Sequence, residues 1–372
     1  MSLGRALAAL FLLLGPLALP SGAGDDGHPA GDSWDWRLPP SFPPPRVPAD
    51  NPMSAAKVEL GRTLFYDRRL SANGEMSCAT CHRPELAFSD GRPRAVGSTG
   101  ELHARSAPSL AGVAYNATLN WDDPAPAALE RQLLTPLLGH EPIEMGNHRS
   151  ADLLDRLRSD LPLGWRFAAA FPGEPEPLNL ENLARAIAAF ERTLISGHSA
   201  FDRWAYGGEE DALSPAARRG LALFHSSRSG CGECHGRFTF SGPIVYQGSR
   251  DAGSEARGLF YNTGLYNLDG RYPADNPGLA RHTLDRRDDG RFRVPTLRNV
   301  AVTAPYMHDG SLPTLDAVIR HYEKGGARHP EQDERVRPFQ LSDQERLDLI
   351  AFLESLTDGD FLTDPRFGPP EP

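Results

Sequence analysis

Two copies of the pattern Cys-x-x-Cys-His constrain this chain more than any other feature. Their members are Cys78, Cys81, His82, Cys231, Cys234 and His235. The sequence contains 4 cysteines in all, so none is left over for a disulfide framework. A redox dithiol does not require a histidine after each pair, and the two pairs lie too far apart in the sequence for a compact zinc site.

On a helical turn, positions i, i+3 and i+4 share one face, so the two thiols and the imidazole of each motif can address one flat ligand. The motifs therefore predict two c-type haems. In each, the cysteines form thioethers to the porphyrin, and the histidine, His82 or His235, binds the iron.

The segments that precede the two motifs resemble each other. SAAKVELGRTLFYD (54–67) and SPAARRGLALFHS (214–226) both begin with a serine suited to cap a helix and both reach Gly-x-x-Leu-Phe. A Phe-Ser pair follows each motif, at 88–89 and at 240–241. This repetition predicts two haem domains related by duplication, which we assign to residues 53–197 and 198–372.

The rest of the sequence predicts a mainly α fold with long ordered loops and little sheet. The chain of 372 residues contains 36 glycines and 34 prolines, which favour many turns. Residues 180–195 place apolar side chains on one helical face, and residues 341–356 open with a capping box formed by Ser342 and Glu345. No strand-rich region competes with these helices.

The N-terminus is typical of an exported protein. Residues 1–23 contain one arginine, a short apolar run and small residues, which predicts a signal peptide cleaved after Ala23. Gly15 and Pro16 interrupt the apolar run, so a membrane anchor is disfavoured. Residues 24–52 form a Pro-rich arm. The net charge of -10, without a long basic run, argues against nucleic acid as a partner.

With these motifs in place, the chain resembles the bacterial di-haem cytochrome c peroxidase and MauG family over nearly its whole mature length. The segments that carry the resemblance are GRTLFYDRRLS, SCATCH, NWDD, LERQLLTP, PIEMG, LFHSSRSGCGECH, FYNTGLYN and FRVPTLRNVAVTAPYMHDG. Together with the WDWRLPPSFPPP arm, they look most like the MbnH-type subgroup, which is similar to MauG and acts on a partner protein.

The resemblance implies a sixth ligand for the second haem. Peroxidases of this family place a methionine there, whereas MauG-like members have a tyrosine, and the matching position is Tyr322. An anionic oxygen ligand stabilises ferric and higher states of iron. His321 is expected to face elsewhere and Met307 to lie in the core. The alternative for Tyr322 is a packed aromatic residue on an amphipathic helix.

For the first haem, the resemblance implies an open distal side. Peroxidase relatives carry a distal histidine seven residues before an arginine, and counting back from Arg105 gives Ser98. We therefore expect a first haem that binds peroxide without prior activation, with His103 as the alternative distal ligand.

Further site residues follow from the same resemblance. Glu144 is expected to move a proton during peroxide cleavage, with Glu141 in reserve and a solvated loop carboxylate as the alternative. Gln132 and Pro136 match other distal positions. Trp121 is expected to carry charge between the haems, although a lone tryptophan is usually a packing residue. A calcium ion is expected between the domains, held by Ser106, Thr303 and Pro305.

These expectations combine into a periplasmic di-haem enzyme that uses hydrogen peroxide to form a high-valent di-haem state. That state would oxidise a residue of an exported partner protein, a tryptophan converted to kynurenine. The alternative is a peroxidase that reduces peroxide with electrons from a small cytochrome or cupredoxin. A non-catalytic electron carrier is disfavoured, because it would need neither Glu144 nor an open haem.

Overall fold

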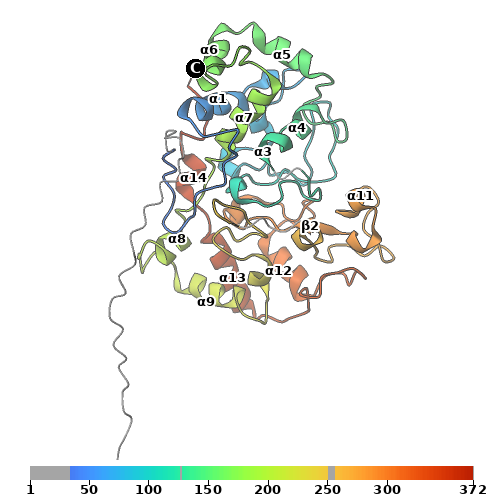
Figure 1. Ribbon diagram of the computed structural model, residues 1–372. Helices are drawn as coiled ribbons and strands as arrows, with labels where there is room; N and C mark the ends of the chain where they lie inside the picture. The colour runs from blue at the N-terminus through green and yellow to red at the C-terminus, as the bar shows by residue number, and fades with distance from the viewer. Residues whose placement is uncertain (1–33, 126–127, 250–255, 372) are drawn as a thin grey trace, which may run out of the picture. The chain divides into compact units, whose positions relative to one another are not determined.

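The computed structural model describes residues 34–125, 128–249 and 256–371 (Figure 1). The predicted signal peptide and residues 24–33 of the arm lie outside this part of the chain. Within it, no helix is both long enough and apolar enough to cross a bilayer.

The described residues are mainly helical, as predicted. The α-helices are α1 (Ala55–Phe65), α2 (Cys78–Cys81), α3 (Leu129–Gln132), α4 (Leu134–Leu138), α5 (Ser150–Arg158), α6 (Leu161–Ala170), α7 (Leu180–Glu191), α8 (Ala200–Ala205), α9 (Pro215–Phe224), α10 (Cys231–Cys234), α11 (Ala280–Thr283), α12 (Leu315–Glu323), α13 (Asp343–Glu354) and α14 (Gly359–Thr363). The sheet is a small antiparallel pair of strands, β1 (Phe260–Asn262) and β2 (Arg291–Arg293), with Phe260 opposite Arg293. Long loops connect these elements.

The helices predicted from the repeated segments form with the predicted caps. The side-chain oxygen of Ser54 accepts the Lys57 N–H at the start of α1, and that of Ser214 accepts the Ala217 N–H at the start of α9. The capping box of Ser342 also begins α13 as expected. Helix α7 is confirmed, although it ends at Glu191 rather than at residue 195.

One helix-packing arrangement occurs twice. Helix α1 packs on α7, and α9 packs on α13 (Figure 1). A Cβ added to Gly61 of α1 would lie 1.9 Å from the Ala186 carbonyl oxygen, and a Cβ added to Gly220 of α9 would lie 1.9 Å from the Asp348 carbonyl oxygen. Both pairs therefore approach closely only because glycine occupies the contact. The duplication seen in the sequence is thus also a duplication in three dimensions.

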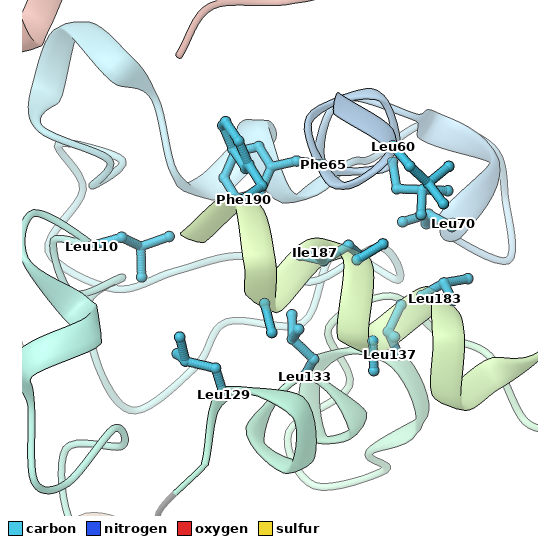
Figure 2. Close-up of a cluster of buried hydrophobic side chains, with 14 of the residues drawn as sticks. Leu60, Phe65, Leu70, Leu110, Leu129, Leu133, Leu137, Leu183, Ile187 and Phe190 are labelled. Carbon is cyan, nitrogen blue, oxygen red and sulfur yellow. The ribbon is translucent and has the colours of Figure 1, made fainter. Parts of the chain in front are cut away.

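Two hydrophobic clusters accompany these helix pairs. In the first, Leu183 and Ile187 of α7 share a buried core with Leu60, Leu133 and Leu137 (Figure 2). The second is built around aromatic side chains of α9 and α13. The first cluster also contains Phe361 and Phe367 from the segment after α13. The domain division between residues 197 and 198 stays a prediction.

The described part of the arm contacts both predicted domains. Phe42 is buried, and its ring centroid lies 6.2 Å from that of Tyr115 and 4.6 Å from that of Phe238. The Tyr115 hydroxyl donates to the Pro43 carbonyl oxygen at 2.8 Å. The arm is thus part of the packed structure.

Candidate functional site

Each Cys-x-x-Cys-His motif folds as one helical turn. Helices α2 and α10 contain the cysteines, and the histidine is the residue that ends each turn. The backbone N–H of His82 donates to the Cys78 carbonyl oxygen, and that of His235 donates to the Cys231 carbonyl oxygen, both at 2.9 Å. Each motif thus has the helical turn that the haem prediction assumes.

The second ring nitrogen of each histidine has a fixed partner. His82 Nδ1 lies 2.8 Å from the Phe88 carbonyl oxygen, and His235 Nδ1 lies 3.1 Å from the Phe240 carbonyl oxygen. A carbonyl oxygen can only accept, so Nδ1 carries the proton and Nε2 keeps the lone pair that would bind iron. Burial lowers the pKa of His82 and lowers that of His235 to about 4, which favours the neutral form that ligates metals.

A hydroxyl group supports each of these carbonyl-bearing turns. Ser109 Oγ donates to the Ala87 carbonyl oxygen at 2.6 Å, and Thr296 Oγ1 donates to the Thr239 carbonyl oxygen at 2.7 Å. In both cases the acceptor residue immediately precedes the phenylalanine that accepts the histidine N–H. The sequence analysis missed these two residues. The sequence signal that could have identified them is a repeated tripeptide, Pro-Ser-Leu at 108–110 and Pro-Thr-Leu at 295–297.

We expect Thr296→Val to raise the reduction potential of the second haem alone. The valine keeps the shape but removes the donor, so the turn that accepts the His235 N–H loosens and the imidazole becomes a weaker ligand. Redox titration followed by optical spectra measures the two potentials. Ser109→Ala is the matched control, because it should raise the first potential and leave the second unchanged. Equal shifts of both potentials in either variant would contradict this pairing.

A large cavity adjoins the second motif. Its wall includes Cys231, Cys234, His235 and Tyr322, together with apolar side chains of α9, α12 and α13 such as Phe224, Ile319, Leu349 and Leu353. This lining suits a flat apolar cofactor that is attached at one edge and ligated through its centre.

A buried cation in the same wall also fits haem. Arg293 is 6% exposed, and its Nε has no hydrogen-bond partner among the described residues. Burial lowers the pKa of this guanidinium to about 10. The described residues form no ion pair with Arg293. A buried charge is costly unless an anion compensates it, and haem carries two propionate groups. The residues present therefore fit the predicted cofactor.

Tyr322 lines the cavity and the adjacent His321 does not, as expected. Tyr322 of α12 lines the cavity, whereas His321 Nε2 lies 3.1 Å from the Thr263 carbonyl oxygen and His321 is not part of the wall. Met307 was expected in the core, and this was wrong. It is half-buried in the cavity wall, where its backbone adopts a left-handed conformation with φ of 71°. The ligand role of Tyr322 stays a prediction.

Trp121 lies in the wall of the same cavity, which residues 89–92 from the segment after the first motif also line. Its Nε1 donates to the Ser106 carbonyl oxygen at 2.9 Å, and the Arg293 guanidinium lies 5.2 Å from its ring centroid. This position, shared by segments that follow both motifs, is compatible with the predicted bridging role and does not test it.

The predicted distal residues gather around Glu144. The Ser98 N–H donates to the Glu144 carbonyl oxygen at 2.8 Å, and the Met145 N–H donates to the Pro136 carbonyl oxygen at 3.0 Å. His103 Nε2 lies 3.1 Å from the Ile143 carbonyl oxygen, so this nitrogen is already engaged.

The electrostatics distinguish the two candidate carboxylates. Burial raises the pKa of Glu144 to about 7, against the opposing charge of Arg105. Glu141 is exposed. Gln132 Nε2 donates to Asn120 Oδ1 at 3.3 Å and so joins this region to the segment of Trp121. A carboxyl group that titrates near neutral pH suits acid-base chemistry, which favours Glu144.

The three predicted calcium residues all lie in the cavity wall. They are Ser106, Thr303 and Pro305. The Ser106 N–H donates to the His308 carbonyl oxygen at 2.8 Å, which joins the two segments. In the described ranges, no group of three or more His, Cys, Asp or Glu residues is arranged to hold a metal ion. A calcium site here would depend on carbonyl and hydroxyl oxygens, and it stays a prediction.

The chain is similar to several known proteins. The family model of the di-haem cytochrome c peroxidases matches residues 55–211. The methylamine utilization protein MauG of Methylorubrum extorquens is 37% identical over 322 residues, covering 86% of this chain and 83% of that protein. The cytochrome-c peroxidase IdrP1 of Denitromonas iodatirespirans is 36% identical, with coverage of 90% and 89%.

A solved structure is also similar. The crystal structure of a MauG-like protein associated with microbial copper homeostasis is 44% identical, with a TM-score of 0.87 and coverage of 91% of this chain and 99% of that one. High identity over nearly the full length of several relatives is not produced by a shared fold alone. This chain belongs to the di-haem cytochrome c peroxidase and MauG family of oxidoreductases.

Proposed function

We propose that this protein is a periplasmic, MauG-like di-haem enzyme that uses hydrogen peroxide to oxidise a tryptophan of an exported partner protein. The observation that carries the proposal is Tyr322 in the wall of the cavity that His235 also lines, with His321 bonded elsewhere. A phenolate oxygen favours oxidised iron, whereas the methionine of an electron-relay haem favours reduced iron. The 44% identical MauG-like structure supports this assignment.

The proton transfer takes place at the first haem, next to Glu144. When bound, the haems supply the redox chemistry, accepting the oxidising equivalents of peroxide. Glu144 takes the proton from the inner oxygen of peroxide as a carboxylate and delivers it to the outer oxygen, which leaves as water. Its raised pKa makes both protonation states accessible near neutral pH. Ser98 in place of a distal histidine leaves room for peroxide.

The bridging and partner roles follow from the same assignment. Trp121 transfers charge between the two haems, and its cavity position next to Arg293 supports that role. The association of the 44% identical relative with copper homeostasis suggests where to look for a partner, namely among exported proteins encoded beside this chain.

The second candidate is a peroxidase fed by a small redox protein. Relatives named cytochrome c peroxidase, such as that of Escherichia coli at 34% identity, favour it. It requires a second haem of high potential, which a tyrosine ligand opposes.

A mixing experiment tests the proposal. The exported protein encoded beside this chain, called the exported neighbour below, is purified and combined with this enzyme and hydrogen peroxide. The exported neighbour is then analysed by peptide mass spectrometry. We expect tryptophan to be replaced by N-formylkynurenine or kynurenine at one position, and only when enzyme and peroxide are both present. An unmodified neighbour, together with rapid peroxide-dependent oxidation of a reduced small cytochrome, would establish the peroxidase instead.

A further inference from the structure

A row of aromatic side chains leads away from the cavity that adjoins the second motif. Phe292 and His308 line the cavity with Tyr322, and their rings stack at a centroid distance of 3.6 Å. Behind them, the buried ring of Tyr272 lies 6.1 Å from that of Phe292 and 6.5 Å from that of His308. The aromatic contacts therefore continue beyond the wall.

The row ends at a tyrosine near the surface. The ring centroid of Tyr266 lies 5.7 Å from that of Tyr272, in an edge-to-face arrangement of 89°. Tyr266 is half-buried, and Leu268, two residues further on, is 57% exposed. Electron transfer weakens steeply with distance, so the two tyrosine rings of Tyr272 and Tyr266 offer an electron a shorter path between the cavity and the surface than a segment without oxidisable side chains does.

Tyr266 differs from the other tyrosines in its hydrogen bond. Its hydroxyl donates to Asp309 Oδ2 at 2.6 Å, a short charge-assisted bond. The hydroxyls of Tyr66 and Tyr261 donate to backbone carbonyls, and that of Tyr272 donates to an amide oxygen. A phenol that loses an electron must also lose its proton, and a carboxylate accepts a proton far more readily than an amide oxygen does.

We propose that Tyr266 is the residue through which oxidising equivalents leave the second haem for the partner protein, with Asp309 as its proton acceptor. The proposal rests on the function proposed above. In the first step Tyr266 gives one electron, by way of Tyr272, toward the cavity where bound haem would accept it, and its phenolic proton moves to Asp309. In the second step the partner residue gives one electron to Tyr266, and the proton returns from Asp309. Two such cycles use the two oxidising equivalents of one peroxide.

The test uses the di-haem protein and peroxide, first without any partner. Electron paramagnetic resonance of rapidly frozen samples should show a tyrosyl radical in the parent protein and none in Tyr266→Phe. Asp309→Asn, which keeps the ring but removes the base, should reduce the radical yield at least 10-fold. Tyr66→Phe is the matched control, because it removes a hydroxyl that donates to a carbonyl in another part of the molecule, and it should leave the signal unchanged.

The second readout adds the exported neighbour. Tyr266→Phe should oxidise it at least 10-fold more slowly, while the optical change produced by peroxide in the enzyme forms at the parent rate. A radical that persists in Tyr266→Phe, or full partner oxidation by this variant, would overturn the route while leaving the proposed function intact. A parent protein that forms the Tyr266 radical but leaves the neighbour unmodified would support the route and count against the proposed function.

Discussion

Replacing Glu144 with glutamine should slow the reaction with peroxide about 100-fold or more, the scale expected for loss of a positioned acid-base group. Glutamine preserves the size of the side chain but neither accepts nor delivers the proton. Stopped-flow spectra after mixing with peroxide measure the rate. Glu141→Gln is the control, because that carboxylate is exposed and should be dispensable. A slow Glu141→Gln variant and a fast Glu144→Gln variant would transfer the role to Glu141.

The rate of the reaction with peroxide should also depend on pH, through the ionisation of Glu144. Burial raises the pKa of Glu144 to about 7, so the carboxylate that removes the proton is the minor form below that pH and the major form above it. The parent rate should therefore increase as the pH rises through about 7. Because glutamine does not titrate, this increase should be absent from Glu144→Gln.

Replacing Tyr322 with methionine should abolish partner oxidation and raise the potential of the second haem. A neutral thioether stabilises reduced iron, whereas an anionic oxygen stabilises the oxidised states needed to store the equivalents of peroxide. Peroxide reduction with an artificial electron donor should survive. Redox titration and mass analysis of the partner measure the two effects.

The neighbouring histidine provides the control for this substitution. His321→Gln can still donate to the Thr263 carbonyl oxygen and should leave the potential unchanged. If His321→Gln shifts the potential and Tyr322→Met does not, the ligand is His321. An unchanged potential in both variants would direct attention to Met307, which also lines the cavity.

The sequence predicted those parts of the fold that local signals determine. Helices α1, α9 and α13 begin where a serine caps them, and these caps involve residues three positions apart. The end of α7 was predicted too far along because the Leu194 carbonyl oxygen accepts the Gly112 N–H at 2.7 Å, a bond made by a distant segment. A tertiary contact thus lies at a boundary that the local pattern missed.

The functional residues also fall into those that local sequence signals predict and those whose role depends on distant contacts. The cysteines and histidines of both motifs were readable because one helical turn contains all their functional atoms. The repeated tripeptides mark Ser109 and Thr296, but their role was not readable because their acceptors lie 22 and 57 residues away. The bond between Tyr266 and Asp309 spans 43 residues. Met307 was misplaced because its left-handed backbone turns the side chain toward the cavity, which no periodic pattern encodes.

The position of Phe361 and Phe367 in the first hydrophobic cluster affects the order in which the protein matures. Phe88, which follows the first motif, has its ring centroid 5.7 Å from that of Phe361. During synthesis the first core therefore stays incomplete until residues 359–367 have emerged, long after the second motif. A chain that lacked this C-terminal segment could not complete the first core.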